Sequence, residues 1–120
     1  MQSCVDAGAN VISISLGGPS FSEIQELVFQ DVYDQDILVI AAAGNSGSDL
    51  RFYPAGYKTI VSVASVAEGG GEGSDTYGEL SWFSTRNDQT EIAAPGRYVR
   101  REVFPIIDVM PSYPRVLDSM

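Results

Sequence analysis

The sequence predicts an α/β fold with a parallel β-sheet, for two reasons. Segments rich in β-branched residues alternate with a segment whose apolar residues recur at helical spacing. One apolar segment, residues 37–43, is unbroken and too short for a good helix, which is typical of a strand covered on both faces of a parallel sheet. The length of 120 residues suits one modest domain or a part of one.

The chain opens with the end of a helix, followed by a strand. Gly8 is placed to close the last turn of a helix that has no N-terminal cap, so we expect the first turns of this helix to be missing. Residues 11–16 alternate apolar with small polar side chains and predict a strand that ends at Gly17 and Gly18.

A helix and two further strands follow. Ser22 is a candidate N-cap with Gln25 three residues later, and the pair predicts a helix over residues 22–35. The apolar face of this helix consists of Ile24, Leu27, Val28 and Val32. Residues 37–43 then complete a βαβ unit, and residues 59–66 give a third strand. We therefore expect three parallel strands.

The last third of the chain carries weaker signals. Residues 68–75 are glycine-rich and acidic, which predicts a mobile surface loop. Two short apolar segments, residues 80–84 and 91–96, flank a polar turn. From residue 97 onward three prolines interrupt a stretch without helical or strand period, so we expect no regular packing there. The predicted organisation is a domain over residues 1–96 and a tail over residues 97–120.

Composition excludes several classes of function. Seven basic against sixteen acidic residues give a net charge of −9, which repels nucleic acid and anionic membranes. No apolar run reaches the roughly 20 residues that span a bilayer. The single cysteine, Cys4, forms no internal disulfide, and without histidine the chain alone cannot build a Cys/His zinc site or a Ser-His nucleophile. The first residues show no secretory signal.

Asn45 is the first candidate for a functional residue. It lies in the sequence AAAGNSG, residues 41–47, directly after a predicted buried strand, and ligands of open α/β sheets bind at the carboxyl ends of strands. Its side chain offers a neutral amide donor to a developing negative charge. The competing interpretation is that Asn45 only caps the following turn, which is the commonest role of such a segment.

Several segments together carry a family resemblance. They are GANVISISLGG at residues 8–18, ILVIAAAGNSG at 37–47, YPA at 53–55, FS at 83–84 and IAAPG at 92–96. In order and spacing they closely resemble consecutive segments of subtilisin-like serine proteases, over about residues 2–96. The resemblance implies a three-layer subtilisin-like fold with a parallel sheet, incomplete in this chain, and peptide-bond hydrolysis by a Ser-His-Asp triad.

The resemblance also implies roles for individual residues. Asn45 matches the oxyanion-hole asparagine, which holds the oxygen of the tetrahedral intermediate. The strand that pairs with an extended substrate peptide matches Ser15, Leu16 and Gly17. One wall of the pocket for the side chain before the scissile bond matches Ala42, Ala43 and Gly44. The competing interpretation of these small residues is that they only allow tight packing. Phe52 falls where many members have a small residue, and its ring would make the pocket shallow or pack in the core.

The triad itself is absent from the matching region. The catalytic aspartate and histidine precede this region in family order, and residues 1–8 resemble neither motif. The nucleophile belongs in a Gly-Thr-Ser-Met-Ala segment about twenty residues after Gly96, but residues 97–120 contain none, and Ser112 and Ser119 lack the context of a nucleophile. We therefore expect a fragment of a serine endopeptidase that is inactive alone.

Two alternatives remain, together with the question of cofactors. A non-catalytic module could bind extended peptides without cleaving them, and a nucleotide-binding protein is disfavoured because Lys58 is the only lysine and no glycine-rich phosphate motif occurs. Family members often bind calcium, and Glu72, Asp75 or Asp88 could supply oxygens, yet their irregular spacing favours a solvated acidic loop. We expect no cofactor, and an extended peptide or protein as partner. The resemblance implies a secreted or vacuolar location.

Overall fold

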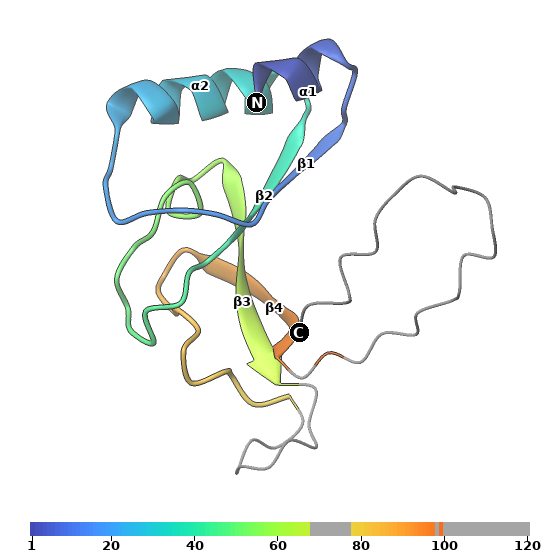
Figure 1. The fold of residues 1–120 in the computed structure, drawn as a ribbon. Coiled ribbons are helices and arrows are strands. Elements are labelled where there is room, and N and C mark those ends of the chain that lie inside the picture. The colour runs from blue at the N-terminus through green and yellow to red at the C-terminus, as the bar shows by residue number, and fades with distance from the viewer. Residues whose placement is uncertain (68–77, 98, 100–120) are drawn as a thin grey trace, which may run out of the picture.

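The computed structural model describes residues 1–67, 78–97 and 99, and within these ranges it contains a four-stranded parallel sheet with two helices (Figure 1). The strands are β1 (Val11–Ile14), β2 (Leu38–Ala42), β3 (Ile60–Ala67) and β4 (Thr90–Arg97), in the spatial order β1-β2-β3-β4. Every neighbouring pair is parallel. The helices are α1 (Gln2–Asp6) and α2 (Glu23–Asp34). The predicted α/β class with a parallel sheet is confirmed.

The βαβ unit forms from β1, α2 and β2 as expected. The side chain of Ser22 caps α2 by accepting a hydrogen bond from the Gln25 amide at 3.4 Å. β1 ends at Ile14, two residues before the predicted end, because the chain leaves the sheet to pair elsewhere. Gly18 and Tyr53 form an antiparallel bridge, with the Gly18 amide 2.9 Å from the Tyr53 carbonyl oxygen and the Tyr53 amide 2.7 Å from the Gly18 carbonyl oxygen.

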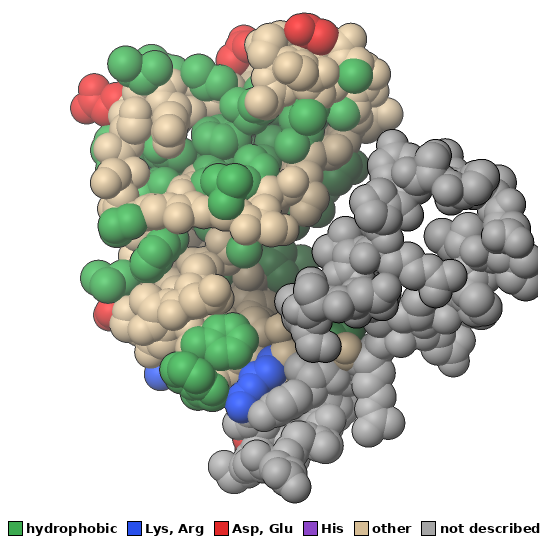
Figure 2. All heavy atoms as spheres, in the orientation of Figure 1, with side chains coloured by type: hydrophobic (Ala, Val, Ile, Leu, Met, Phe, Trp, Pro, Cys, Tyr) green, Lys and Arg blue, Asp and Glu red, His purple; other side chains and the backbone are tan. Residues whose placement is uncertain are grey.

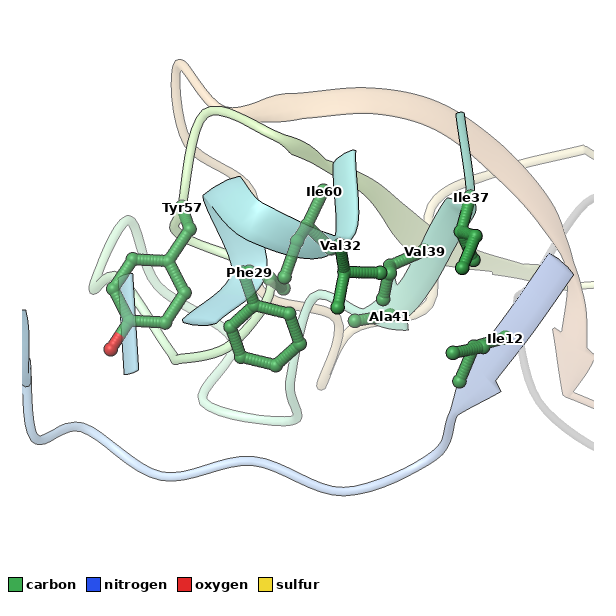
Figure 3. Packing of buried hydrophobic residues seen from close by; sticks show 9 residues of the cluster. Ile12, Phe29, Val32, Ile37, Val39, Ala41, Tyr57 and Ile60 are labelled. Carbon is green, nitrogen blue, oxygen red and sulfur yellow. The ribbon is translucent and has the colours of Figure 1, made fainter. Parts of the chain in front are cut away.

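The hydrophobic core lies between α2 and one face of the sheet. Phe29 and Val32 of α2 point toward the side chains of β1 and β2, including Ile12 and Val39 (Figure 3). Tyr57 extends this cluster, with its ring centroid 5.6 Å from that of Phe29. Apolar burial against the sheet therefore orients α2 and fixes the segments that enter and leave it.

The expectation that residues 37–43 are covered on both faces is wrong for the described part of the chain. Val39 and Ala41 are 1% exposed, but Leu38 between the core positions is 42% exposed and Ala42 is exposed as well. Burial thus alternates along β2, because both helices of the described ranges pack against the same cluster on one face.

The sheet has one strand more than expected. β4 pairs in parallel with β3 from Ser62 opposite Thr90 to Ala67 opposite Arg97, with two register shifts. β4 lies at the edge of the described sheet, where a strand can include Pro95 without losing a ladder bond on its free side. The strand includes Arg97, so the regular structure extends one residue past the predicted boundary. The predicted loop at residues 68–75 and nearly all of the predicted tail lie outside the described residues.

Several large apolar side chains of the described residues face solvent. Hydrophobic atoms gather over much of the face drawn in Figure 2. The most exposed large apolar residues are Leu16 (72%), Ile24 (76%), Leu27 (70%) and Trp82 (70%). None of the described helices is long and apolar enough to cross a membrane.

Candidate functional site

The carboxyl ends of β1 and β2 meet at one edge of the sheet, because the two strands are parallel and Ile14 lies opposite Ala41. The segments that leave these ends enclose a cleft of about 390 Å³. Its lining consists of Ser15, Leu16, Gly17, Ala42, Gly44, Asn45, Ser46 and Phe52. The structure thus brings together all but one of the residues singled out from the sequence.

Ala43 is the exception. Ala43 is only 2% exposed, and its amide donates to the Val63 carbonyl oxygen at 2.9 Å. It lines a neighbouring hollow of about 350 Å³ over the sheet, a hollow that also reaches Asn45 and Gly96. Ala43 therefore lies behind the wall of the cleft rather than on its surface.

Close backbone packing places one wall of the cleft. A Cβ atom on Gly17 would lie 2.8 Å from the Tyr53 carbonyl oxygen, closer than real Cβ atoms approach. The segment that contains Ser15 can therefore pack against Tyr53 only with glycine at position 17. This contact is a structural reason for the glycine, in addition to the room that a bound peptide needs.

The loop after β2 presents Asn45 to the cleft. Gly44 has φ +110°, a conformation that favours glycine, and it turns the chain so that the Asn45 side chain is exposed. The Asn45 side-chain amide makes no hydrogen bond to any residue in the described ranges. Its donors are thus unused by the described residues, at a position that lines both the cleft and the neighbouring hollow, and the side chain caps no turn within the part of the chain that is described.

A second segment, residues 83–88, holds this loop along its length, and we call it the 83–88 clamp. The Gly47 amide donates to the Phe83 carbonyl oxygen at 2.7 Å, and the Arg86 amide donates to the Ser48 carbonyl oxygen at 3.0 Å. Thr85, which is 0% exposed, bonds the loop on both sides of Asn45. Sequence reasoning missed this clamp, because its partners lie far apart in the chain, as Ser46 and Thr85 do at 39 residues, and many of the bonding atoms belong to the main chain.

An ion pair closes the far end of the clamp. Nη2 of Arg51 donates to both carboxylate oxygens of Asp88, at 2.7 and 2.6 Å. The hydrogen bond from Arg51 holds the pKa of Asp88 below its ordinary value, and the same bond raises the pKa of Arg51. Both side chains are exposed, at 45% and 70%, so the pair is screened by solvent.

The ion pair also bears on the candidate calcium ligands. Both oxygens of Asp88 are engaged by Arg51, while Glu72 and Asp75 lie outside the described residues. Within the described ranges, no group of three or more acidic, cysteine or histidine side chains is placed to hold a metal ion.

Comparisons with known proteins agree on one family. A sequence model described as the Subtilase family matches residues 1–113. The predicted division of the chain at residue 96 is not tested by this match and stays a prediction. The chain is 35% identical over 94 residues to thermitase from Thermoactinomyces vulgaris, covering 78% of this chain and 31% of thermitase. It is 34% identical over 91 residues to a thermophilic serine proteinase from Bacillus sp. (strain AK1), covering 76% of this chain and 21% of that protein.

Solved structures give the same result. A psychrophilic subtilisin-like protease from the Antarctic psychrotroph Pseudoalteromonas sp. AS-11 superimposes with a TM-score of 0.70 at 36% identity, covering 79% of this chain and 20% of that one. The prenylagaramide maturation protease superimposes with a TM-score of 0.66 at 27% identity, covering 79% of this chain and 34% of that one. The chain therefore spans between a fifth and about a third of these relatives.

Proposed function

This chain belongs to the subtilase family, and we propose that it supplies the oxyanion donor and the substrate-binding strand of a subtilisin-like serine endopeptidase. The observation that carries the proposal is the exposed residue Asn45, whose amide has no partner in the described ranges and which lines a cleft together with Ser15 and Gly17. A peptide-cleaving site needs this combination of an anion-holding donor beside a segment that can align an extended chain.

The proposed mechanism assigns separate tasks to the two walls of the cleft. An extended peptide pairs with the main chain of Ser15, Leu16 and Gly17, as a strand added to the edge of a sheet. This pairing brings the carbonyl of the scissile bond next to Asn45, whose Nδ2 donates to the oxygen as it becomes negative. A neutral amide suits this task, because it stabilises the charge only as the charge develops. In subtilisin itself, loss of such a donor lowers turnover by about 10²–10³.

We propose that the triad comes from residues other than these 120; the chain contains no histidine, so the general base at least must come from elsewhere. We therefore propose that the full 120-residue chain alone does not hydrolyse peptide esters or amides at any pH. The measurement is the release of product from a chromogenic ester. Turnover that survived repurification and serine-protease inhibitor controls, and then vanished when a serine of this chain was replaced, would refute the proposal.

The oxyanion role can be tested without catalysis. A product peptide ends in a carboxylate, which places an anionic oxygen where the tetrahedral oxygen would lie, whereas the same peptide with a terminal carboxamide does not. We expect the carboxylate peptide to bind the chain about tenfold more tightly, as a charge-assisted hydrogen bond allows. The variant Asn45→Ala loses this preference and keeps the weaker binding of the carboxamide peptide.

The matched control is Asn10→Ala, because Asn10 lies just before β1, away from the cleft lining, and only its main-chain oxygen bonds to β2. This variant keeps the preference for the carboxylate. If the intact chain shows no preference, or if Asn45→Ala retains it, the oxyanion role is wrong.

The second candidate is a peptide-binding module derived from the same fold. The same cleft would align a peptide, but the Asn45 amide would only orient a carbonyl. The two candidates differ in independent folding: a module must bury its own apolar surface, whereas a segment of a larger domain leaves part of it for neighbouring elements. A chain that stays monomeric at every ionic strength would favour the module.

A further inference from the structure

We propose that Thr85 is the positioning residue for Asn45, an inference that rests on the proposed function and deepens it. Thr85 does not line the cleft, and it is 0% exposed. It therefore touches no substrate, and whatever it contributes must act through the loop that carries Asn45.

Thr85 bonds both peptide units that flank Asn45. Its amide donates to the Gly44 carbonyl oxygen at 2.9 Å, and this oxygen belongs to the peptide bond before Asn45. Its Oγ1 accepts a hydrogen bond from the Ser46 amide at 3.1 Å, and this amide belongs to the peptide bond after Asn45. With both planes fixed, the direction of the Asn45 Cα–Cβ bond is fixed as well.

The hydroxyl of Thr85 is itself held by neighbours. Its Oγ1 lies 2.8 Å from Oγ of Ser46, which in turn lies 2.8 Å from Oγ of Ser48. This chain of hydroxyl groups lets Thr85 accept from the Ser46 amide while its own proton goes to a second partner, so the buried oxygen is satisfied. A fully bonded buried group holds one geometry, because every alternative leaves a polar atom unpaired.

The approach of Thr85 depends on Gly44. A Cβ atom on Gly44 would lie 3.0 Å from Oγ1 of Thr85, so any larger residue would displace the hydroxyl or the loop. The backbone of Gly44 and the side chain of Thr85 are thus fitted to each other. This fit leaves the Asn45 side chain as the free end of an otherwise fixed turn, which is what preorganised anion binding requires.

The test uses the full chain at low salt and compares three variants. Thr85→Val removes the hydroxyl and keeps the shape, Thr85→Ser keeps the hydroxyl, and Ser84→Ala is the matched control. Ser84 is also 0% exposed; its Oγ accepts from the Ser65 amide at 2.9 Å and donates to the Thr85 carbonyl oxygen at 3.3 Å, an atom that Thr85 does not use to hold the loop of Asn45. Thr85→Val and Ser84→Ala therefore each remove one buried hydroxyl that holds a main-chain amide.

The first measurement needs no ligand. Amide hydrogen exchange at Ser46 speeds up about tenfold or more in Thr85→Val and stays near the original rate in Thr85→Ser and Ser84→Ala. The second measurement is the ratio of affinities for the carboxylate and carboxamide peptides. Thr85→Val brings this ratio close to one while the carboxamide peptide binds as before, and Thr85→Ser preserves the ratio.

The possible outcomes distinguish failure of the Thr85 inference from failure of the proposed oxyanion role of Asn45. If the unaltered chain shows no preference for the carboxylate, the oxyanion role of Asn45 fails, and a role for Thr85 in positioning it fails with it. If the unaltered chain shows the preference and Thr85→Val retains it, Thr85 does not position Asn45. Loss of the preference in Ser84→Ala would show a general effect of lost stability and overturn the inference. Should Thr85→Val not fold, loss of the preference in Thr85→Ser would overturn it instead.

Discussion

The ring of Phe52 packs so closely on Gly44 that a Cβ atom at position 44 would lie 3.0 Å from Cγ of Phe52. The same Cβ atom would also lie 3.0 Å from Oγ1 of Thr85, and the φ of Gly44, +110°, is one that residues with a Cβ rarely adopt. The choice of residue at position 44 is therefore restricted both by the neighbouring side chains and by the backbone conformation.

We predict that Gly44→Ala lowers the free energy of unfolding by about 2 kcal/mol or more, because the substitution adds backbone strain to a steric clash. Gly18→Ala is the control, since a Cβ there meets no heavy atom within 4 Å and its φ is not in the left-handed region. Urea denaturation measures both. Equal stability of the two variants would show that the contacts of Gly44 relax without cost.

Phe52 lies where its ring would make a side-chain pocket shallow, which is one of the two interpretations of the sequence. Its side chain is half-buried, lines the cleft and also packs on Gly44. We predict that Phe52→Ala increases the affinity for peptides with a large C-terminal side chain by about tenfold or more, since even one methylene group in an apolar pocket has an effect of this size. Isothermal calorimetry with peptides ending in alanine and in phenylalanine measures the change.

The control for this prediction is Phe21→Ala. Phe21 is also aromatic and packs on Tyr53 with ring centroids 5.4 Å apart, but it does not line the cleft. The prediction fails if both alanine variants change the affinities equally, or if the two peptides respond alike to Phe52→Ala.

The elements that the sequence predicted well are those with local signals. The apolar run around Val39 predicts β2, and the capping pair Ser22 and Gln25 predicts the start of α2. Each signal lies within a few neighbouring residues of the sequence. The cleft followed from them, because parallel strands place their carboxyl ends at one edge. The role of β4 could not be predicted in the same way, since Pro95 and Gly96 interrupt its pattern and the strand is specified by pairing with β3.

The ion pair between Arg51 and Asp88 predicts a dependence of stability on pH. The pKa of Asp88 in the folded chain lies below its ordinary value of 3.8 because Arg51 bonds its charged form. A lowered pKa in the folded state means that the stabilising contribution is complete above the unfolded pKa and is lost as the pH falls through the folded value. We therefore expect Arg51→Gln to lower the melting temperature at pH 6 but to match the unaltered chain near pH 2.

Arg86→Gln is the charge-matched control for this experiment. Arg86 belongs to the same clamp and is exposed, and within the described residues it forms only a main-chain bond to Ser48. Thermal melting between pH 2 and 6 distinguishes the pair from a general effect of charge. A difference between Arg51→Gln and the unaltered chain that persisted at the acid end would disprove the assignment.

The exposed apolar surface predicts association controlled by salt. Ile24 is 76% exposed and lines a groove of about 490 Å³ between α2 and Leu16. The net charge of −9 keeps copies apart, but its reach shortens as ions are added, so association should rise with ionic strength.

The variant Ile24→Gln should reduce this association, whereas Leu50→Gln, at a 59% exposed position in a loop, should leave it unchanged. Sedimentation velocity at low and high salt measures the effect. Association that is independent of salt, or equally reduced by both variants, would contradict the explanation.

The clamp was invisible in the sequence for a different reason than β4. Its contacts join Ser46 to Thr85 across 39 positions, and no local pattern marks a threonine that will bond two peptide units far away in the chain. In the sequence alone, Thr85 is indistinguishable from a threonine that only packs in the interior, because the loop that it bonds is distant in the chain.

The clamp also bears on how far such a chain can diverge in sequence. The bonds from Gly47 to Phe83 and from Arg86 to Ser48 join main-chain atoms, which every residue except proline supplies on the donor side. The side chains at positions 83 and 86 can therefore change over generations while the loop keeps its path. Gly44, Gly47 and Thr85, together with the hydroxyl groups of Ser46 and Ser48, contribute atoms or space that a substitution would remove or obstruct. The position of the Asn45 amide thus tolerates substitutions at the main-chain contacts of the clamp and depends on this small set of glycines and hydroxyl groups.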